Sequence, residues 1–437
     1  MTQILQRLGL GRRDLRAWAM YDWANSAFQT TIIAAVFPIY FHSVVAKDLG
    51  EAVSTSRFAW ATTIAIVIVA VIAPLLGAIA DYAAMKKRML AIFLFIGATA
   101  TIAMYGIGPG DWQLALLLFV IGNVGVAGSI VFYESLLPHL VSQAELDRVS
   151  SAGYAMGYLG GGVLLAINLA MIQKPAWFGI GDAGMAVRLS LASVGVWWLV
   201  FSIPIFRQVP EPPRKLEADE NSDAGLLATG FTRLVETFKE LRTFRQAFLL
   251  LLAFLIYNDG IQTIIRMATT FGTQVGIDQS AMITALLITQ FIGIPFAFGF
   301  GMLADRIGAK TAVFGGLLVY AFIVVLAYFM KTAAHFYLLA IMVGMVQGGT
   351  QALSRSLFAS MIPKHKSSEF FAFFGVFERY AGILGPLVFA VMVDATGQSR
   401  NAILAVVGFF VIGGALLAFV KVDEGRQAAR QAEAMVA

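Results

Sequence analysis

The sequence contains no cysteine and very little histidine. Its 437 residues include no Cys and only four His, which excludes disulfide bonds, thiolate metal sites and cysteine nucleophiles. It also shows no Ser/His/Asp ordering, no zinc-ligand spacing and no G-x-S-x-G motif of the kinds that hydrolases use. We therefore expect a protein without a metal or another cofactor, and not an enzyme.

Charge is scarce as well. Charged residues make up 13% of the chain and hydrophobic residues 59%, with a mean hydropathy of +0.78, which is more apolar surface than one water-soluble core could bury. The net charge of +5 comes from basic residues scattered through short loops instead of a patch, so we expect a lipid bilayer, and no nucleic acid, as the partner.

Long apolar runs are what the chain has in abundance. About 20 apolar residues are needed to cross a hydrocarbon core of ~30 Å, and twelve such runs occur. They cover residues 17–44, 58–83, 89–108, 112–137, 150–172, 186–206, 246–274, 280–304, 311–330, 335–361, 369–393 and 401–420. We predict one transmembrane helix for each run and number these spans from first to twelfth.

Lys and Arg are distributed unequally between the two sides of the predicted helices. If the N-terminus is cytoplasmic, the inner loops and tails contain 22 of these residues and the outer loops six. Inner loops of membrane proteins are enriched in Lys and Arg. The bias predicts that both termini are cytoplasmic, in an integral protein of a bacterial inner membrane.

A long polar segment separates the first six spans from the last six. Residues 207–245 begin with Pro210, Pro212 and Pro213 and end in the amphipathic stretch FTRLVETFKELRTF. This composition predicts a flexible linker followed by an interfacial helix. We therefore expect an N-terminal six-helix half over 1–206, a cytoplasmic linker over 207–245 and a C-terminal six-helix half over 246–437.

The two halves share matched residues at a nearly constant offset, as internal repeats of transporters do. Two residues recur at an offset of 224 and three at 225: Gly77 as Gly301, Asp81 as Asp305, Pro138 as Pro363, Gly157 as Gly382 and Gly160 as Gly385. Five pairs at matching positions indicate that the halves arose by duplication.

One repeated segment is a short turn after the second and eighth spans. The second copy reads GMLADRIGAK and the first GAIADYAAMKKR. In this respect the chain resembles the major facilitator superfamily, whose loop signature is G-x-x-x-D-R-x-G-x-K. The second copy matches at Gly301, Asp305, Arg306, Gly308 and Lys310, whereas the first keeps Gly77 and Asp81 but has Tyr82 in place of Arg.

The resemblance implies an all-α membrane protein with the major facilitator fold, twelve transmembrane helices in two pseudo-symmetric six-helix halves. It also implies that Asp81 and Asp305 help to latch the halves together in one state of the cycle. The first copy departs from the signature at Tyr82, which stands where Arg is usual for the clasp on the other half. The plainer alternative is a basic turn that only sets topology.

Four further segments narrow the resemblance. They are YDWANSAF from Tyr21, YNDGIQT from Tyr257, QGGTQALSRSLFASMIP from Gln347 and EFFAFF from Glu369. These segments look like the vacuole-effluxer-like branch of the superfamily, which includes fungal vacuolar proteins implicated in amino-acid efflux. The resemblance therefore suggests an amino acid as the substrate.

Charged residues inside the predicted spans must face a water-filled cavity or pair with each other, because a lipid-facing charge costs roughly 3 kcal/mol. Residues three, four and seven apart share one helix face, and two corresponding spans carry such rows. The first span has Asp22, Asn25 and Gln29, and the seventh has Asp259, Gln262 and Arg266. We expect both rows to line a cavity; the alternative is a structural polar stripe between helices.

The fourth, tenth and eleventh spans add Glu134, Gln351, Arg355 and Glu378. Arg355 has two possible roles. Its planar guanidinium is suited to binding a substrate carboxylate, or it forms a salt bridge with Glu378 or another acid that only ties helices together.

These features favour a secondary active transporter, a monomer that moves a small polar or zwitterionic solute by alternating access. We expect proton coupling through Asp22, Glu134 or Asp259, because a partly desolvated carboxylate can exchange protons near neutral pH. The alternative is a transporter-like membrane sensor or lipid-handling protein that moves no soluble substrate.

Overall fold

The computed structural model describes residues 2–213, 243–274, 276–277, 279–381, 384–385, 387–388, 391–392 and 403–435. Helices joined by short loops and turns make up this part of the chain, which contains no strand. The N-terminal half contains α1 (Thr2–Arg7), α2 (Arg13–Ala27), α3 (Val36–Tyr40), α4 (Glu51–Tyr82), α5 (Lys86–Ala103), α6 (Trp112–Leu140), α7 (Leu146–Gln173) and α8 (Ala183–Gln208). The C-terminal half contains α10 (Arg245–Gln274), α11 (Gln279–Ile307), α12 (Ala309–Tyr328), α13 (Ala333–Ser360), α14 (Ser367–Tyr380), α17 (Val407–Phe419) and α18 (Val422–Met435).

The helices reproduce the predicted spans closely. Within the described residues, ten helices are long and apolar enough to cross a membrane, and an eleventh is counted if α17 and α18, which meet at 58°, form one span. The predicted eleventh span begins as α14, and its remainder includes residues outside the described ranges. The all-helical membrane fold expected from the apolar runs is therefore confirmed.

The first span is the least regular one. It runs from Arg13 to Val45, and two π-helical segments, Phe28–Ala35 and Phe41–Val45, interrupt it around α3. A π-helix widens the turn and often occurs at functional sites. Gln29, one of the predicted cavity residues, lies in the first of these segments.

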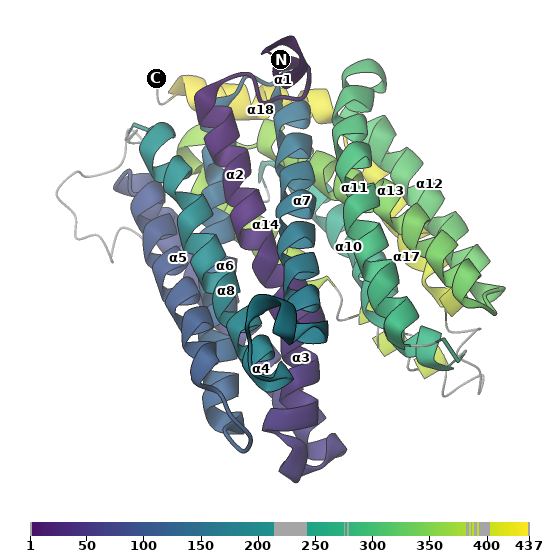
Figure 1. The fold of residues 1–437 in the computed structure, drawn as a ribbon. Helices are drawn as coiled ribbons and strands as arrows, with labels where there is room; N and C mark the ends of the chain where they lie inside the picture. The colour runs from purple at the N-terminus through teal and green to yellow at the C-terminus, as the bar shows by residue number, and fades with distance from the viewer. Residues whose placement is uncertain are drawn as a thin grey trace.

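The N-terminal and C-terminal halves lie side by side in Figure 1, the first purple to teal and the second green to yellow. Both chain ends, with α1 and α18, lie at the same end of the bundle, which we call the terminal face. Helix α7 packs against α11 and α13, while α14 packs against α4 and α6. Helices of one half therefore insert against helices of the other.

Helices α8 and α17, near the ends of the two halves, are each held by a lysine of the same half, as expected for a duplication. Lys87 Nζ donates to the carbonyl oxygens of Phe206 at 3.0 Å and Val209 at 2.5 Å, at the end of α8. Lys310 Nζ donates to those of Ala418 at 2.8 Å and Val420 at 2.7 Å, at the end of α17. Each lysine satisfies carbonyl groups that have no partner inside the helix.

Two features near the terminal face differ from the sequence-based expectation. Residues 214–242, with most of the predicted interfacial helix, lie outside the described ranges. In contrast, the amphipathic helix α18 follows the last span and lies across the terminal face (Figure 1), where Gly425 and Ala429 are buried. Its apolar positions are few and small, so the hydropathy pattern of the sequence did not identify it.

Candidate functional site

Arg355 lies at the centre of the contacts between the halves. Helix α13 carries it, and only 1% of its surface is exposed. Its Nε donates to the Ser150 hydroxyl at 2.9 Å and its Nη2 to the Ser150 carbonyl oxygen at 2.8 Å. Because Ser150 belongs to α7 of the N-terminal half, these two bonds join the halves directly.

The third nitrogen of the guanidinium faces two acids. Arg355 Nη1 lies 3.5 Å from Asp22 Oδ2 and 3.6 Å from Glu134 Oε1. Both distances exceed the ~2.7–2.9 Å of a direct charge-assisted hydrogen bond. Nη1 is therefore the least firmly held nitrogen of Arg355, and it lies between two carboxylates of the other half.

Aromatic rings enclose this charge cluster. The Arg355 guanidinium carbon lies 4.6 Å from the ring centre of Tyr154 and 5.0 Å from that of Trp18. Trp18 stacks on Tyr133 with ring centres 4.6 Å apart, and the Tyr133 hydroxyl donates to Asp22 Oδ2 at 2.8 Å. Cation–π contacts of this kind stabilise a desolvated guanidinium.

The cluster has more negative than positive charge when both acids are ionised. Two carboxylates face one guanidinium, and Glu134 Oε2 is buried and accepts no hydrogen bond from the described residues. Glu378 of α14 is half-buried and close enough to act electrostatically on Glu134. A proton on one carboxylate would balance the charge and relieve the cost of a buried acceptor without a donor.

The predicted row of the first span is only partly directed at the cluster. Asp22 joins it, whereas Asn25 donates from Nδ2 to the Tyr21 carbonyl oxygen of its own helix at 3.0 Å. Gln29 is half-buried one turn further from the terminal face.

One turn from Arg355, Gln351 Nε2 donates to Asn258 Oδ1 at 3.5 Å. The buried Asn258 Nδ2 has no hydrogen-bond partner within the described structure. Sequence analysis did not select Asn258, because a neutral amide in a span carries no charge signal. We add it to the candidate binding residues.

Asp259 differs from its counterpart Asp22. It is fully buried, and its two oxygens accept the backbone N–H groups of Leu384 at 3.1 Å and Gly385 at 2.7 Å. The end of α14 at Tyr380 and these two residues mark a break in the eleventh span, and Asp259 caps the segment that follows it. This geometry supports the structural alternative for Asp259, whose coupling role stays a prediction.

The other two residues of the seventh-span row contribute less to the described site. Gln262 is half-buried in α10, and the side chain of Arg266 lies outside the described residues. The two rows that the sequence presented as equivalent therefore occupy different environments.

The repeated turns lie at the terminal face, where each reaches the first turn of a helix in the opposite half. Asp81 pairs with Lys86, and its Oδ2 accepts the Glu369 N–H at 3.0 Å, at the start of α14. Asp305 pairs with Arg148, at the start of α7. The clasp of the first copy therefore forms, although Tyr82 replaces the usual Arg.

The glycines of the turns allow this approach. A methyl group at Gly77 would lie 2.8 Å from the Ser368 carbonyl oxygen, and one at Gly301 would lie 2.9 Å from the Ser151 side chain. Gly308, which precedes α12, has φ 83°, a left-handed conformation that favours glycine. Arg306 is exposed. These positions fit the predicted gating role, which stays a prediction.

Serines make many of the remaining contacts between the halves. Ser368 Oγ donates to Ser135 Oγ at 3.0 Å, Ser367 Oγ to the Ser135 carbonyl oxygen at 2.9 Å, and Ser356 Oγ to Asp147 at 2.5 Å. Sequence analysis missed them, because an isolated serine in an apolar run is most simply read as a small packing residue. Like the clasps, these contacts lie toward the terminal face.

In the described part of the chain, no group of three or more His, Cys, Asp or Glu side chains is arranged to hold a metal ion. The site is instead an ion-pair cluster between two bundles, with amides one turn away from it. Such an arrangement can bind opposite charges and can exchange a proton.

Comparisons with known proteins agree with this architecture. Residues 11–430 match the family model described as vacuole effluxer Atg22 like. An uncharacterized MFS-type transporter of Bacillus subtilis, YxiO, is 35% identical over 95% of this chain and 96% of its own length. Autophagy-related protein 22 of Kluyveromyces lactis is 25% identical over 80% of this chain and 76% of its own length.

Solved structures share the fold at low identity. The transporter FucP in an outward conformation has a TM-score of 0.68 at 15% identity, covering 95% of this chain and 99% of its own. The human organic anion transporter MFSD10 has a TM-score of 0.66 at 15% identity, covering 93% of this chain and 99% of its own. These likenesses concern the fold alone.

Proposed function

The chain belongs to the vacuole effluxer Atg22-like family of major facilitator transporters, and on this premise we propose that it carries a small zwitterionic solute by alternating access coupled to protons. Amino acids are the favoured substrates. The observation that carries the proposal is the position of Arg355 of the C-terminal half. It is hydrogen-bonded to Ser150 of the N-terminal half and faces Asp22 and Glu134 of that half.

A zwitterion is chemically matched to this ion pair. Its carboxylate would bind the Arg355 guanidinium, which presents several N–H donors and keeps its charge. Its ammonium group would bind Asp22 or Glu134. The solute would thus replace the ion pair between the halves by two ion pairs, one with Arg355 and one with an acid of the other half. The neighbouring amides of Gln351 and Asn258 would hydrogen-bond its polar groups.

Proton coupling follows from the charge of the same cluster. A bound zwitterion adds one positive and one negative charge, so it leaves the net charge of the cluster unchanged. Without it, one guanidinium faces two acids, and a proton on Glu134 balances the charge. The loaded cluster is therefore balanced by the same proton, so proton and solute would move together, and each pH unit supplies about 1.4 kcal/mol per proton.

The orientation in the membrane follows from the bias of basic residues toward the terminal face. We assign this face to the cytoplasm, so that the described state is closed to the cytoplasmic side. The outward conformation of FucP, a structure of similar fold, is consistent with this assignment. We place the protein in the bacterial inner membrane as a monomer.

Purified protein in proteoliposomes tests the proposal. We expect uptake of at least one labelled amino acid, accumulation above equilibrium under an imposed pH gradient, and none in empty vesicles. Replacing Glu134 by Gln should abolish gradient-driven accumulation and keep exchange between internal and external substrate. The exposed residue Glu424 provides the matched control, and Glu424→Gln should behave as the wild type.

Two outcomes would change the proposal. If Glu134→Gln accumulates substrate as the wild type does, the proton is carried elsewhere. If a panel of amino acids, peptides, sugars and organic acids produces neither flux nor thermal stabilisation, the alternative of a sensor or lipid-handling protein is favoured instead.

A further inference from the structure

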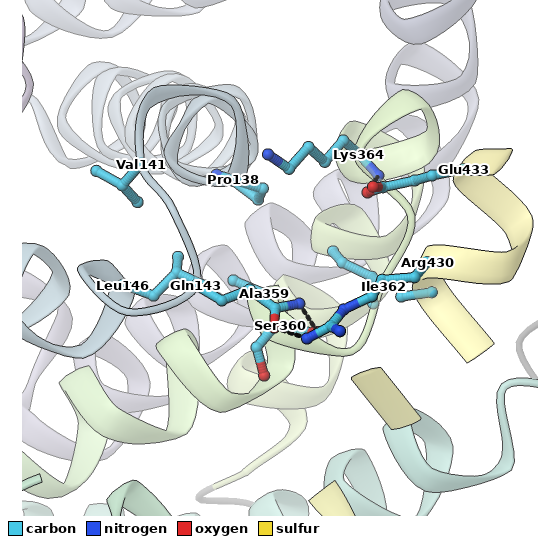
Figure 2. Close-up of a pocket in the computed structure, with 11 residues that line it drawn as sticks. Pro138, Val141, Gln143, Leu146, Ala359, Ser360, Ile362, Lys364, Arg430 and Glu433 are labelled. Atoms are coloured by element: carbon cyan, nitrogen blue, oxygen red, sulfur yellow. Dashed lines mark hydrogen bonds between the residues drawn. The ribbon is translucent and has the colours of Figure 1, made fainter. Parts of the chain in front are cut away.

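A pocket lies at the terminal face, apart from the Arg355 cluster. It has a volume of about 290 Å³ and three walls: the connection between α6 and α7 from one half, the end of α13 and the loop after it from the other half, and α18 (Figure 2). Its lining residues are Pro138, Val141, Gln143, Leu146, Ala359, Ser360, Ile362, Lys364, Ala429, Arg430 and Glu433.

Two basic side chains, Lys364 and Arg430, contribute to the lining of this pocket. Figure 2 shows the Lys364 side chain reaching toward Pro138 and the Arg430 side chain reaching toward Gln143. Arg430 Nη2 donates to the Gln143 amide oxygen at 2.9 Å. In the described ranges, neither Lys364 nor Arg430 forms an ion pair.

The acid in the lining is already engaged elsewhere. Glu433 Oε1 accepts the backbone N–H of Lys364 at 3.0 Å. The pocket therefore combines two cations with one carboxylate that is held by the backbone. An anion bound in the pocket would be attracted to both cations.

The rest of the lining is apolar, since Pro138, Val141, Leu146, Ile362 and two alanines contribute to it. A bare inorganic ion would leave this surface without contacts, whereas a molecule with a short carbon skeleton would cover it. We propose that the pocket binds a small organic dianion, bearing carboxylate or phosphate groups, and that the bound ligand holds the halves closed at the terminal face.

Ligand binding should depend on the conformational state, because the walls of the pocket come from both halves. Helix α18 is fixed to the C-terminal half, where Arg426 Nε donates to Ser360 Oγ at 3.4 Å and Gln246 Nε2 to Glu424 at 2.9 Å. It touches the N-terminal half through Arg430 and Gln143. Separation of the halves at this face would divide the pocket, so a ligand binds one state and shifts the population toward it.

Binding of two probes to the purified protein tests the first part of the inference. We choose succinate and glycerol 3-phosphate, which separate a carboxylate-specific site from a phosphate-specific one. Isothermal titration should show binding of at least one probe, and Lys364→Gln and Arg430→Gln should each raise its Kd about tenfold, as loss of a charged contact does. Lys421→Gln, which removes an exposed lysine of the same face, should leave the Kd unchanged.

The alkylation rate of a single cysteine tests the second part. The natural chain has no Cys, and Ser151 is fully buried against Gly301 at the contact between the halves. In Ser151→Cys, the bound probe should slow alkylation several-fold, and adding Arg430→Gln should remove most of this protection at a probe concentration near the wild-type Kd.

The inference is overturned if neither probe binds the wild type, if both charge variants bind as tightly as the wild type, or if the bound probe leaves alkylation unchanged. Both measurements are made without a transported substrate. They can therefore fail while the proposed transport function holds, and they can succeed while that function fails.

Discussion

Arg355 shows how the surroundings of one side chain decide between roles that its sequence context allows equally. A guanidinium inside a span suggests either a substrate ligand or a helix tie. In the described state, Ser150 occupies two of its nitrogens and two acids face the third. The contacts support a tie between helices, and in the cycle that we propose a zwitterion would bind at Nη1, so the two roles would belong to different steps.

Replacing Arg355 by Lys tests this account at the scale of the residue. Lysine keeps the charge but has one nitrogen, and it cannot hold Ser150 and face two acids at once. We expect Arg355→Lys to reduce uptake at least tenfold and to raise the concentration of amino acid needed for half-maximal thermal stabilisation.

The matched control for this substitution is Arg57→Lys, since Arg57 lies 5.4 Å from the Trp112 ring, outside the site. Undiminished substrate affinity in Arg355→Lys would restrict Arg355 to tying the helices. Equal loss in both variants would indicate a general effect of the Arg-to-Lys change.

At the scale of the element, the break in the eleventh span explains why a carboxylate is buried at Asp259. A helix that restarts inside a membrane has backbone N–H groups without partners, and the Asp259 carboxylate accepts two of them. Sequence periodicity paired Asp259 with Asp22, because both occupy the same place in the repeat. Periodicity identifies a helix face and cannot reveal what a neighbouring helix presents to that face.

Asp259→Ala therefore should destabilise the fold more than an ordinary surface change. Each buried N–H left without a partner costs about 1–3 kcal/mol, so we expect a clear fall in the unfolding temperature in detergent. The exposed Asp48 supplies the control, and Asp48→Ala should be neutral. Normal stability in Asp259→Ala together with loss of proton coupling would favour the coupling role instead.

Close packing of the first span on α7 makes a second prediction for elements. A methyl group at Gly160 would collide with the Trp23 carbonyl group, whereas one at Gly315 has nothing within 4 Å. Gly160→Ala should lower stability by about 1–3 kcal/mol, the usual cost of overpacking.

Gly315→Ala should be neutral or stabilising, because alanine favours a helix by about 1 kcal/mol over glycine. Thermal unfolding of the two variants measures the difference. Equal stability of both would contradict the close contact at Gly160.

More of the fold than of the site could be predicted from the sequence. Long apolar runs, charge bias and repeated turns depend on local composition, and each predicted span up to the tenth overlaps a described helix. The site depends on partners distant in sequence. Ser150 and Asn258 carry no signal of their own, and only the packing of α7, α10 and α13 brings them to Arg355 and Gln351.

At the scale of the whole molecule, polar contacts between the halves gather toward the terminal face. They include the clasps of Asp81 and Asp305, the serine contacts of Ser135 with α14 and the Arg355 cluster. Alternating access requires these contacts to separate and re-form in each cycle. A covalent link across this face should therefore stop transport without preventing folding.

The most direct measurement is transport by the variant Ser135→Cys/Ser368→Cys, whose two hydroxyl oxygens lie 3.0 Å apart in opposite halves and whose background contains no other cysteine. The single-cysteine variants serve as controls. Oxidation should abolish amino-acid uptake by the double variant, and reduction should restore it. Uptake at the wild-type rate by fully cross-linked protein would contradict alternating access between these halves.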